Sequence, residues 1–227
     1  MGYINGPNIV QDSLIVCYDP QNPMSKVSTT TIDNTVSPQF QGTAQNTFSD
    51  PGVTPNYLNF RGGSNPFSTT ADILYSGTNF PATTTYSLNF WIKHNGNQTD
   101  NFDRIFGTDG NIFEVAEDIS NKIRIFEGAW QTSTVTVNTV GWTNIVVINT
   151  VDPEIKIYQN GVLEDTIAAG RSMTNVGWRL GGNGNSSSSD QECWKGFLGY
   201  FSAYTKELSN AEVIQNYNAL KSRFITS

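Results

Sequence analysis

The chain has 227 residues and a formal net charge of −7 at pH 7, and its 13 Lys and Arg are scattered. It therefore lacks the basic stripe that nucleic-acid binding requires, and we expect no nucleic-acid partner. With 37% hydrophobic and 15% charged residues the composition is too apolar for disorder, while no apolar run is long enough to cross a membrane, so we expect one folded domain over residues 1–227.

The start of the chain, MGYINGPNIVQD, shows neither the basic segment nor the apolar stretch of a secretory signal peptide. We therefore expect the product to begin in a cytoplasm, with residues 1–11 as an N-terminal extension. Cys17 and Cys193 fall in strand-like segments and are predicted to be buried free thiols, with a disulfide as the alternative. No Cys or His neighbours cluster around them, which argues against zinc.

Short β-type runs separated by turn residues recur along the chain. Strands are predicted at 13–19, 57–60, 86–93, 104–108, 112–117, 122–127, 133–138, 142–150, on both sides of 160–161, at 177–182 and at 196–204. Ile123 and Ile125 alternate with Lys122 and Arg124, as in an antiparallel strand with one face in solvent. The apolar run within NIVVIN (144–149) instead predicts a strand covered on both faces. Strands at this spacing, without helices between them, favour a sandwich or barrel.

Asn160-Gly161 predicts a type I′ turn, since both central residues of that turn need positive φ. The strand that follows carries two neighbouring acids, Glu164 and Asp165. A retaining glycosidase needs two carboxyl groups about 5 to 5.5 Å apart on one face, whereas neighbouring strand residues point to opposite faces. We therefore interpret these acids as a solvated hairpin edge that discourages aggregation.

One helix is predicted, at the C-terminal end, where Ser209 and Glu212 have the spacing of a capping box. Its apolar face comprises Val213, Ile214, Tyr217, Leu220 and Phe224. Core packing is the expected role of that face, with partner binding as the alternative. Residues 25–55 are predicted to form a long surface excursion, with or without one edge strand, and residues 181–192 a polar loop.

Six segments carry a family resemblance, in this order: SLIVCYDPQNP, YSLNFWIK, WTNIVVI, IKIYQNGVLE, WRLGG and GFLGYFSAYTKELSNAEVIQNYNALKSRF. Their order resembles the concanavalin A-like, laminin G-like jelly-roll superfamily of lectins and glucanases. The resemblance implies an all-β, two-sheet antiparallel sandwich with one short C-terminal helix and with the first strand beside the last. It implies glycan binding, glycan cleavage or structural packing as the function, and fold alone does not choose among them.

The start MGYINGPNIV followed by LIVCYD is similar to structural proteins of tailed bacteriophages, especially those that infect marine cyanobacteria. The similarity departs at residues 26–56, where those relatives show a Trp and a DLSGNGN-type turn and this chain has TTTIDNTVSPQFQGTAQNTF. The role of that turn in the relatives is therefore not assigned to this chain.

The acid run that the resemblance would imply for a glucanase, Glu-x-Asp-x-x-Glu on one strand, does not occur. In EVAED, Glu114 and Asp118 are in phase, but Ala116 occupies the middle position and Glu117 is out of phase. His94 is the only histidine and enters a turn, so a Ser-His-Asp device is poorly supported. We therefore expect no enzyme and no obligatory cofactor.

A calcium site is left open as an alternative on Asp100, Asp103 and Asp109, which offer hard oxygen ligands in a turn-rich region. Asp is also an ordinary turn residue that bonds its own backbone, and that is the competing interpretation.

Aromatic platforms beside amide or carboxylate side chains would mark a glycan site, because sugars offer apolar C–H faces and hydroxyls. The candidates are Trp130 in a predicted turn, and Trp178 and Trp194 flanking a loop with Asn183, Asn185 and Asp190. Core packing is the alternative for each tryptophan, and Trp91 and Trp142 are predicted to be core.

The functional prediction is a non-catalytic structural or decoration protein of a tailed-phage virion, made in the host cytoplasm. It would be assembled by contacts with other virion proteins, with itself as an oligomer, or both, and could add adhesion to cell-surface glycans. The alternative is a carbohydrate-binding adhesin of a tail fibre or cell surface, and the third interpretation is a glucanase-like glycoside hydrolase.

Overall fold

The computed structural model describes residues 8–22, 25, 31–44, 57–63, 73–95, 102–168, 170–182 and 193–225. Within them lie 15 strands, two short 3-10 helices and one α-helix. The strands are β1 (Leu14–Tyr18), β2 (Thr31–Ile32), β3 (Gly42–Ala44), β4 (Leu58–Gly63), β5 (Leu74–Ser76), β6 (Tyr86–His94), β7 (Asp103–Thr108), β8 (Glu114–Glu117), β9 (Lys122–Phe126), β10 (Trp130–Thr136), β11 (Trp142–Asn149), β12 (Ile155–Gln159), β13 (Val162–Ile167), β14 (Trp178–Leu180) and β15 (Cys193–Tyr204). The helices are η1 (Pro38–Phe40), η2 (Asp109–Asn111) and α1 (Asn210–Phe224).

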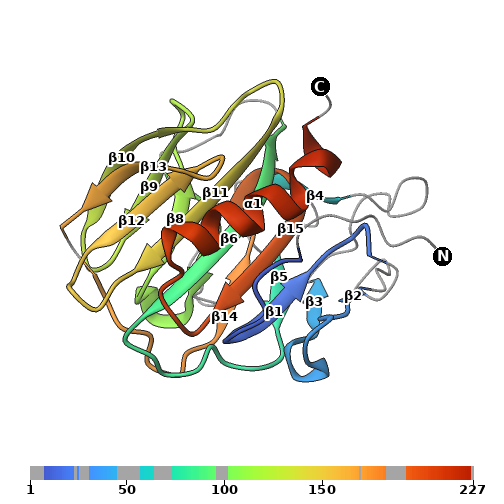
Figure 1. Cartoon of the computed structure of the whole chain (residues 1–227), viewed down its shortest axis with the longest axis horizontal. Coiled ribbons are helices and arrows are strands. Elements are labelled where there is room, and N and C mark those ends of the chain that lie inside the picture. Colours follow the sequence, from blue (N-terminus) through green and yellow to red (C-terminus); the bar gives the residue numbers. More distant parts are fainter. Residues whose placement is uncertain are drawn as a thin grey trace.

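The strands pair into two layers (Figure 1). The first layer has the order β13-β12-β11-β6-β15, with β1 and β4 both on the far side of β15. The second has the order β10-β9-β8-β7-β14-β5-β3-β2. A single parallel bridge between Cys193 and Arg104 connects them at the start of β15. The layers thus form the antiparallel sandwich that the sequence predicts.

The long strand β15 joins both ends of the chain. It pairs antiparallel with β1, with Tyr18 opposite Phe201, and with β6 along its other edge. The first strand therefore returns beside the last, as the family resemblance implies.

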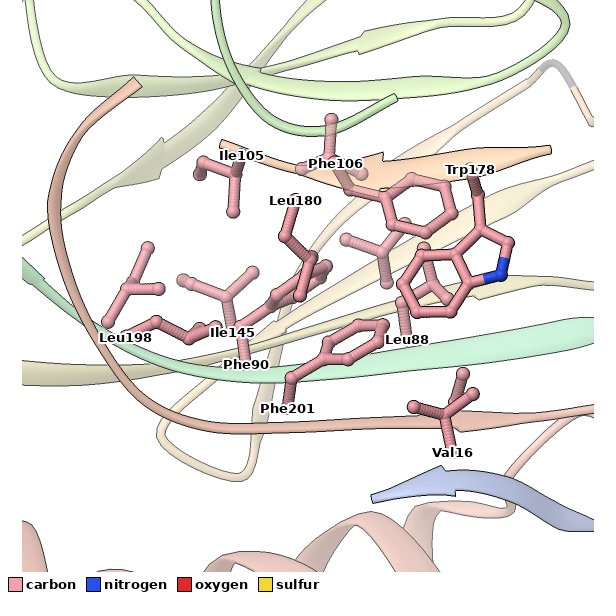
Figure 2. Packing of buried hydrophobic residues seen from close by; sticks show 14 of the residues in the cluster. Val16, Leu88, Phe90, Ile105, Phe106, Ile145, Trp178, Leu180, Leu198 and Phe201 are labelled. Atoms are coloured by element: carbon pink, nitrogen blue, oxygen red, sulfur yellow. The ribbon is translucent and has the colours of Figure 1, made fainter. Parts of the chain in front are cut away.

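Aromatic side chains from both layers meet in the space between them (Figure 2). Phe201 of β15 lies 5.6 Å from Trp178 of β14 and 6.2 Å from Phe106 of β7, measured between ring centroids. Phe90 of β6 adds a ring 5.1 Å from Phe201. This core removes large apolar areas from water, at about 25 cal/mol per Å², and is the main source of stability.

A second core lies between the first layer and helix α1, which crosses the outer face of β6 and β15 (Figure 1). Trp91 of β6 stacks on Tyr217 at 5.7 Å and on Phe224 at 4.6 Å. Strand β11 serves both cores, because Val146 and Ile148 face the helix while Ile145 and Val147 face the sandwich interior. The prediction of a strand covered on both faces is confirmed.

The helix has the predicted capping box: Ser209 Oγ accepts from the Glu212 N–H at 3.4 Å, and Glu212 Oε2 accepts from the Ser209 N–H at 2.9 Å. Its buried face differs from the prediction at one place. Ile214 is 40% exposed, and Asn216 is buried instead. Asn216 is tolerated there because it accepts from the Val10 N–H at 2.7 Å and donates to Tyr204 at 3.1 Å.

Strand β5 was not predicted, and residues 25–55, for which one edge strand was considered, contain two, β2 and β3. Residues 31–44 pair through β3 onto β5 at the edge of the second layer, so this part of the expected surface excursion is built into the sheet. Ile32 and Phe40 anchor it in the main core. With two or three residues each, these strands are too short for alternation to be visible in the sequence.

The predicted hairpin is present, with φ of 51° at Asn160 and 83° at Gly161. Both cysteines are buried and free, as expected. The helices in the part of the chain that the structure describes include none with the length and hydropathy to cross a membrane.

Candidate functional site

Helix α1 covers only part of the outer face of the first layer. Beyond its last residue, Phe224, one row of side chains continues across the strands. Lys93 of β6 is the cross-strand partner of Trp142 on one side and of Phe197 on the other. Because paired residues point to the same face, these three side chains form a row that the helix leaves open to ligands.

A cavity of about 320 Å³ lies over this row. We call it the aromatic pocket, and its lining residues are Gln21, Tyr57, Lys93, Trp142, Phe197 and Arg223. They come from β6, β11, β15, the end of α1 and two segments next to β1 and β4, so the site exists only once both chain ends have docked.

Three rings shape the pocket. Tyr57 meets Phe197 edge to face at 4.8 Å and lies 6.1 Å from Trp142, measured between ring centroids. Trp142 in turn rests on Phe224 at 5.0 Å. Tyr57 is 38% exposed, and Trp142 and Phe197 are half-buried, so ring surface remains available to a ligand. The prediction that Trp142 lies in the core is thus only partly right. Part of its ring stays exposed, because helix α1 ends before covering it.

Polar groups converge on the same cavity. Arg223 donates through Nε to Gln21 at 2.9 Å and through Nη1 to Asp19 at 2.9 Å. Lys93 is half-buried between the rings. Such a mixture of ring faces with a few fixed donors is what sugar recognition requires, since C–H faces stack on rings and hydroxyls accept hydrogen bonds.

Trp130, the expected platform, begins strand β10 opposite Phe126 and does not lie in a turn. Its ring is half-buried, 4.8 Å from Phe102 and 5.3 Å from Phe126. The guanidinium groups of Arg104 and Arg124 lie 5.5 and 5.4 Å from its centroid. These four neighbours already occupy much of the ring surface, so Trp130 offers a smaller platform than the aromatic pocket.

Trp178 and Trp194 are 2% and 1% exposed, which corrects their assignment as sugar platforms. Trp178 packs in the sandwich core, and the Trp194 indole donates to Glu117 Oε2 at 2.8 Å. Neither presents a ring face to a ligand. The polar residues assigned with them, Asn183, Asn185 and Asp190, lie outside the described residues.

The structure separates two of the three proposed calcium ligands. Asp103 begins β7 and Asp109 directly follows its last residue, so the two are about 20 Å apart along the strand. Asp103 is buried, and Asp109 pairs with Arg179 at 2.8 Å. These two residues cannot share an ion, and Asp100 lies outside the described residues. The described ranges contain no group of three or more His, Cys, Asp or Glu side chains with metal-binding geometry.

The acids considered for catalysis are engaged in the fold. Glu114 accepts from Arg104 Nε at 2.7 Å, and Glu117 meets His94 Nδ1 at 3.0 Å. Asp165 Oδ2 accepts from the Thr134 N–H of β10 at 2.7 Å, while Glu164 is exposed. Asp165 is therefore more than a solvated edge group, because it ties the edge of the first layer to the edge of the second.

Sequence reasoning missed Tyr57, Lys93, Phe197 and Arg223 as site residues. Tyr57, Lys93 and Phe197 all lie within predicted strands, at 57–60, 86–93 and 196–204, so each looked like part of a sheet. Only the register between β6, β11 and β15 brings them together.

A family model described as the concanavalin A-like lectin/glucanases superfamily matches residues 62–214, about two thirds of the chain. No curated protein matches. Among solved structures, a Trypanosoma rangeli sialidase is similar at 11% identity and a TM-score of 0.64, covering 93% of this chain and 33% of that one.

Two further similar structures concern proteins that interact with glycans. One, on botulinum neurotoxin type C and its interaction with two ganglioside molecules, matches at 16% identity and a TM-score of 0.63, over 92% of this chain and 51% of that one. The other is domain 4 of AbnA, an extracellular arabinanase from Geobacillus stearothermophilus, in complex with arabinotriose; it matches at 15% identity and a TM-score of 0.63, over 90% and 98%. This chain thus spans a third to a half of the sialidase and neurotoxin structures. At such identities the likeness shows the fold alone.

Proposed function

Because the chain belongs to the concanavalin A-like lectin/glucanase superfamily, we propose that it is a non-catalytic carbohydrate-binding protein whose site is the aromatic pocket. The observation that carries the proposal is the convergence of Tyr57, Trp142 and Phe197 on one cavity with Lys93 and Arg223. Similar solved structures of proteins that interact with gangliosides or are in complex with arabinotriose support it.

The size of the site and its ordered rings fit a sugar. A cavity of about 320 Å³ lies at the lower end of the range for small-molecule sites and accommodates a short segment of a glycan. The rings are held by one another and by Phe224, so they are ordered before a ligand arrives and lose little freedom on binding.

The absence of catalysis is part of the proposal. Glu114 and Glu117 are both fully buried and engaged by Arg104, His94 and Trp194. A general acid and a nucleophile must instead face a common cleft that admits the substrate.

The test is glycan binding by the Tyr57→Ala variant. We expect wild-type protein to bind members of a glycan array and Tyr57→Ala to lose that binding at least tenfold, because one stacked ring is removed. Tyr57 is 38% exposed, so the melting temperature should change little.

Trp130→Ala is the matched aromatic control. If the aromatic pocket is the site, Trp130→Ala retains glycan binding. Loss of binding in Trp130→Ala together with full binding in Tyr57→Ala would move the site to β10 and contradict the proposal.

We further propose that this protein is a component of a tailed-phage virion, made in the host cytoplasm and held by contacts with other virion proteins or with further copies of itself. The motif order from MGYINGPNIV and LIVCYD to the closing helix favours this location. Immunogold electron microscopy of purified particles should then label the capsid or the tail, and unlabelled particles would contradict it. A glycan-binding surface on a virion is compatible with attachment to a cell.

A further inference from the structure

Lys93 gives the aromatic pocket a charge preference. We infer that the pocket selects acidic sugars, with a ligand carboxylate at the Lys93 ammonium and an apolar sugar face against Tyr57 or Trp142. This inference rests on the proposed function and narrows its ligand class.

Lys93 is placed by the register of the sheet. It lies between Trp142 and Phe197 in one row of the first layer, and its side chain is half-buried there. Its side chain lines the same cavity as the three rings, where a ligand carboxylate is partly shielded from water. A charge-assisted hydrogen bond is stronger in that setting than on an open surface.

Two other half-buried lysines, Lys156 and Lys206, contrast with Lys93. Lys156 pairs with Glu207 at 2.9 Å, and Lys206 pairs with Asp12 at 2.7 Å and with Glu212 at 2.6 Å. Among the described residues, Lys93 makes no ion pair, and no carboxylate lines the aromatic pocket. A ligand carboxylate would supply the counter-charge that this lysine lacks.

Arg223 adds donors next to this charge. Its guanidinium binds Asp19 through Nη1 and Nη2 and Gln21 through Nε, which engages three of its five N–H groups and leaves two for a ligand or water. Asp19 largely balances its charge, so Arg223 serves hydroxyl recognition and Lys93 carries the net positive charge of the pocket.

Two electrostatic fields disfavour an anion at this site: that of the α1 helix dipole and that of the net charge of the chain. The C-terminal end of α1 carries a partial negative charge, which Lys221 of its last turn partly offsets. The chain as a whole carries −7 and repels anions at long range. The preference for an acidic sugar must therefore come from direct contact between its carboxylate and the Lys93 ammonium, at a distance shorter than the Debye length, where salt screens little.

The experiment is an array on which carboxylated oligosaccharides are printed beside their methyl esters, which keep the shape and remove the charge. Wild-type protein should prefer the acids about tenfold or more. Lys93→Met should abolish the preference while keeping residual binding to the esters, and Lys93→Arg should restore it. Lys122→Met, which removes an exposed lysine from the other layer, should change nothing.

The outcomes separate this inference from the proposed function. Equal binding of acids and esters that depends on Tyr57 would overturn the charge preference and leave the carbohydrate site standing. An acid preference that survives Lys93→Met would also overturn the inference, because another group would then provide the charge. Binding to neither ligand class would overturn both proposals.

Discussion

Gly199 shows how one residue opens the aromatic pocket. It lies at a register shift in β15, between Leu198 and Tyr200. A Cβ atom there would stand 2.3 Å from Cε1 of Phe224 and 3.0 Å from Cζ3 of Trp142. The missing side chain therefore lets the end of α1 and the pocket wall lie directly on the strand.

Gly199→Ala should destabilise the protein by about 1 to 3 kcal/mol, because the added methyl group overpacks both rings. It should also weaken glycan binding, since Trp142 has to move. Denaturant unfolding monitored by tryptophan fluorescence measures the first effect. Gly77→Ala is the control, because no atom lies within 4 Å of a Cβ at Gly77. Equal midpoints for the two variants would contradict the packing account.

At the scale of elements, helix α1 links stability to the site. Its N-terminus is fixed by the Ser209–Glu212 capping box, and its other end supplies Arg223 to the pocket. Between them, Trp91 is stacked on Tyr217 and Phe224. A helix that frays would release both the second core and one wall of the pocket.

Ser209→Ala should lower the free energy of unfolding by about 0.5 to 2 kcal/mol, because the N–H of Glu212 loses its acceptor. Thermal and denaturant unfolding measure the change. Ser222→Ala, at an exposed position of the same helix, should have little effect. An unchanged midpoint in Ser209→Ala would remove capping from the stability of this domain.

At the scale of the whole molecule, hydrogen bonds at one edge hold the two layers together in addition to the apolar core. Asp165 of β13 accepts from the Thr134 N–H of β10, and Thr134 Oγ1 donates to the Glu164 carbonyl oxygen at 3.3 Å. These bonds close the sandwich at the side opposite β1. Asp165 and the Glu164 carbonyl oxygen thus have a structural role, and the two acidic side chains share no cleft.

We expect the purified protein to hydrolyse no β-glucan, as judged by reducing-sugar release. The double change Glu164→Gln with Asp165→Asn should leave glycan binding unaltered, because neither residue lines the aromatic pocket. Melting should shift slightly, since Asp165 loses one of its two acceptor oxygens. Glucan cleavage that disappears in the double variant would contradict the non-enzyme proposal.

The sequence by itself determined the elements whose signal is local. Asn160-Gly161 specifies its turn through positive φ, and Ser209 with Glu212 specifies the start of α1. The alternation of Ile123 and Ile125 with charged residues specifies which face of β9 is buried. Such local patterns favoured an all-β sandwich or barrel with one terminal helix, and the family resemblance implied the two-sheet sandwich.

Only the tertiary structure decided which aromatic side chains are available to a ligand. Trp178 and Trp194 flank a polar loop in the sequence, yet both are buried, while Trp142 in an apolar strand is half open. Whether a strand residue is covered depends on what packs over it from elsewhere in the chain. Here that is the length of α1, which ends at Phe224 and leaves Trp142, Lys93 and Phe197 only half-buried.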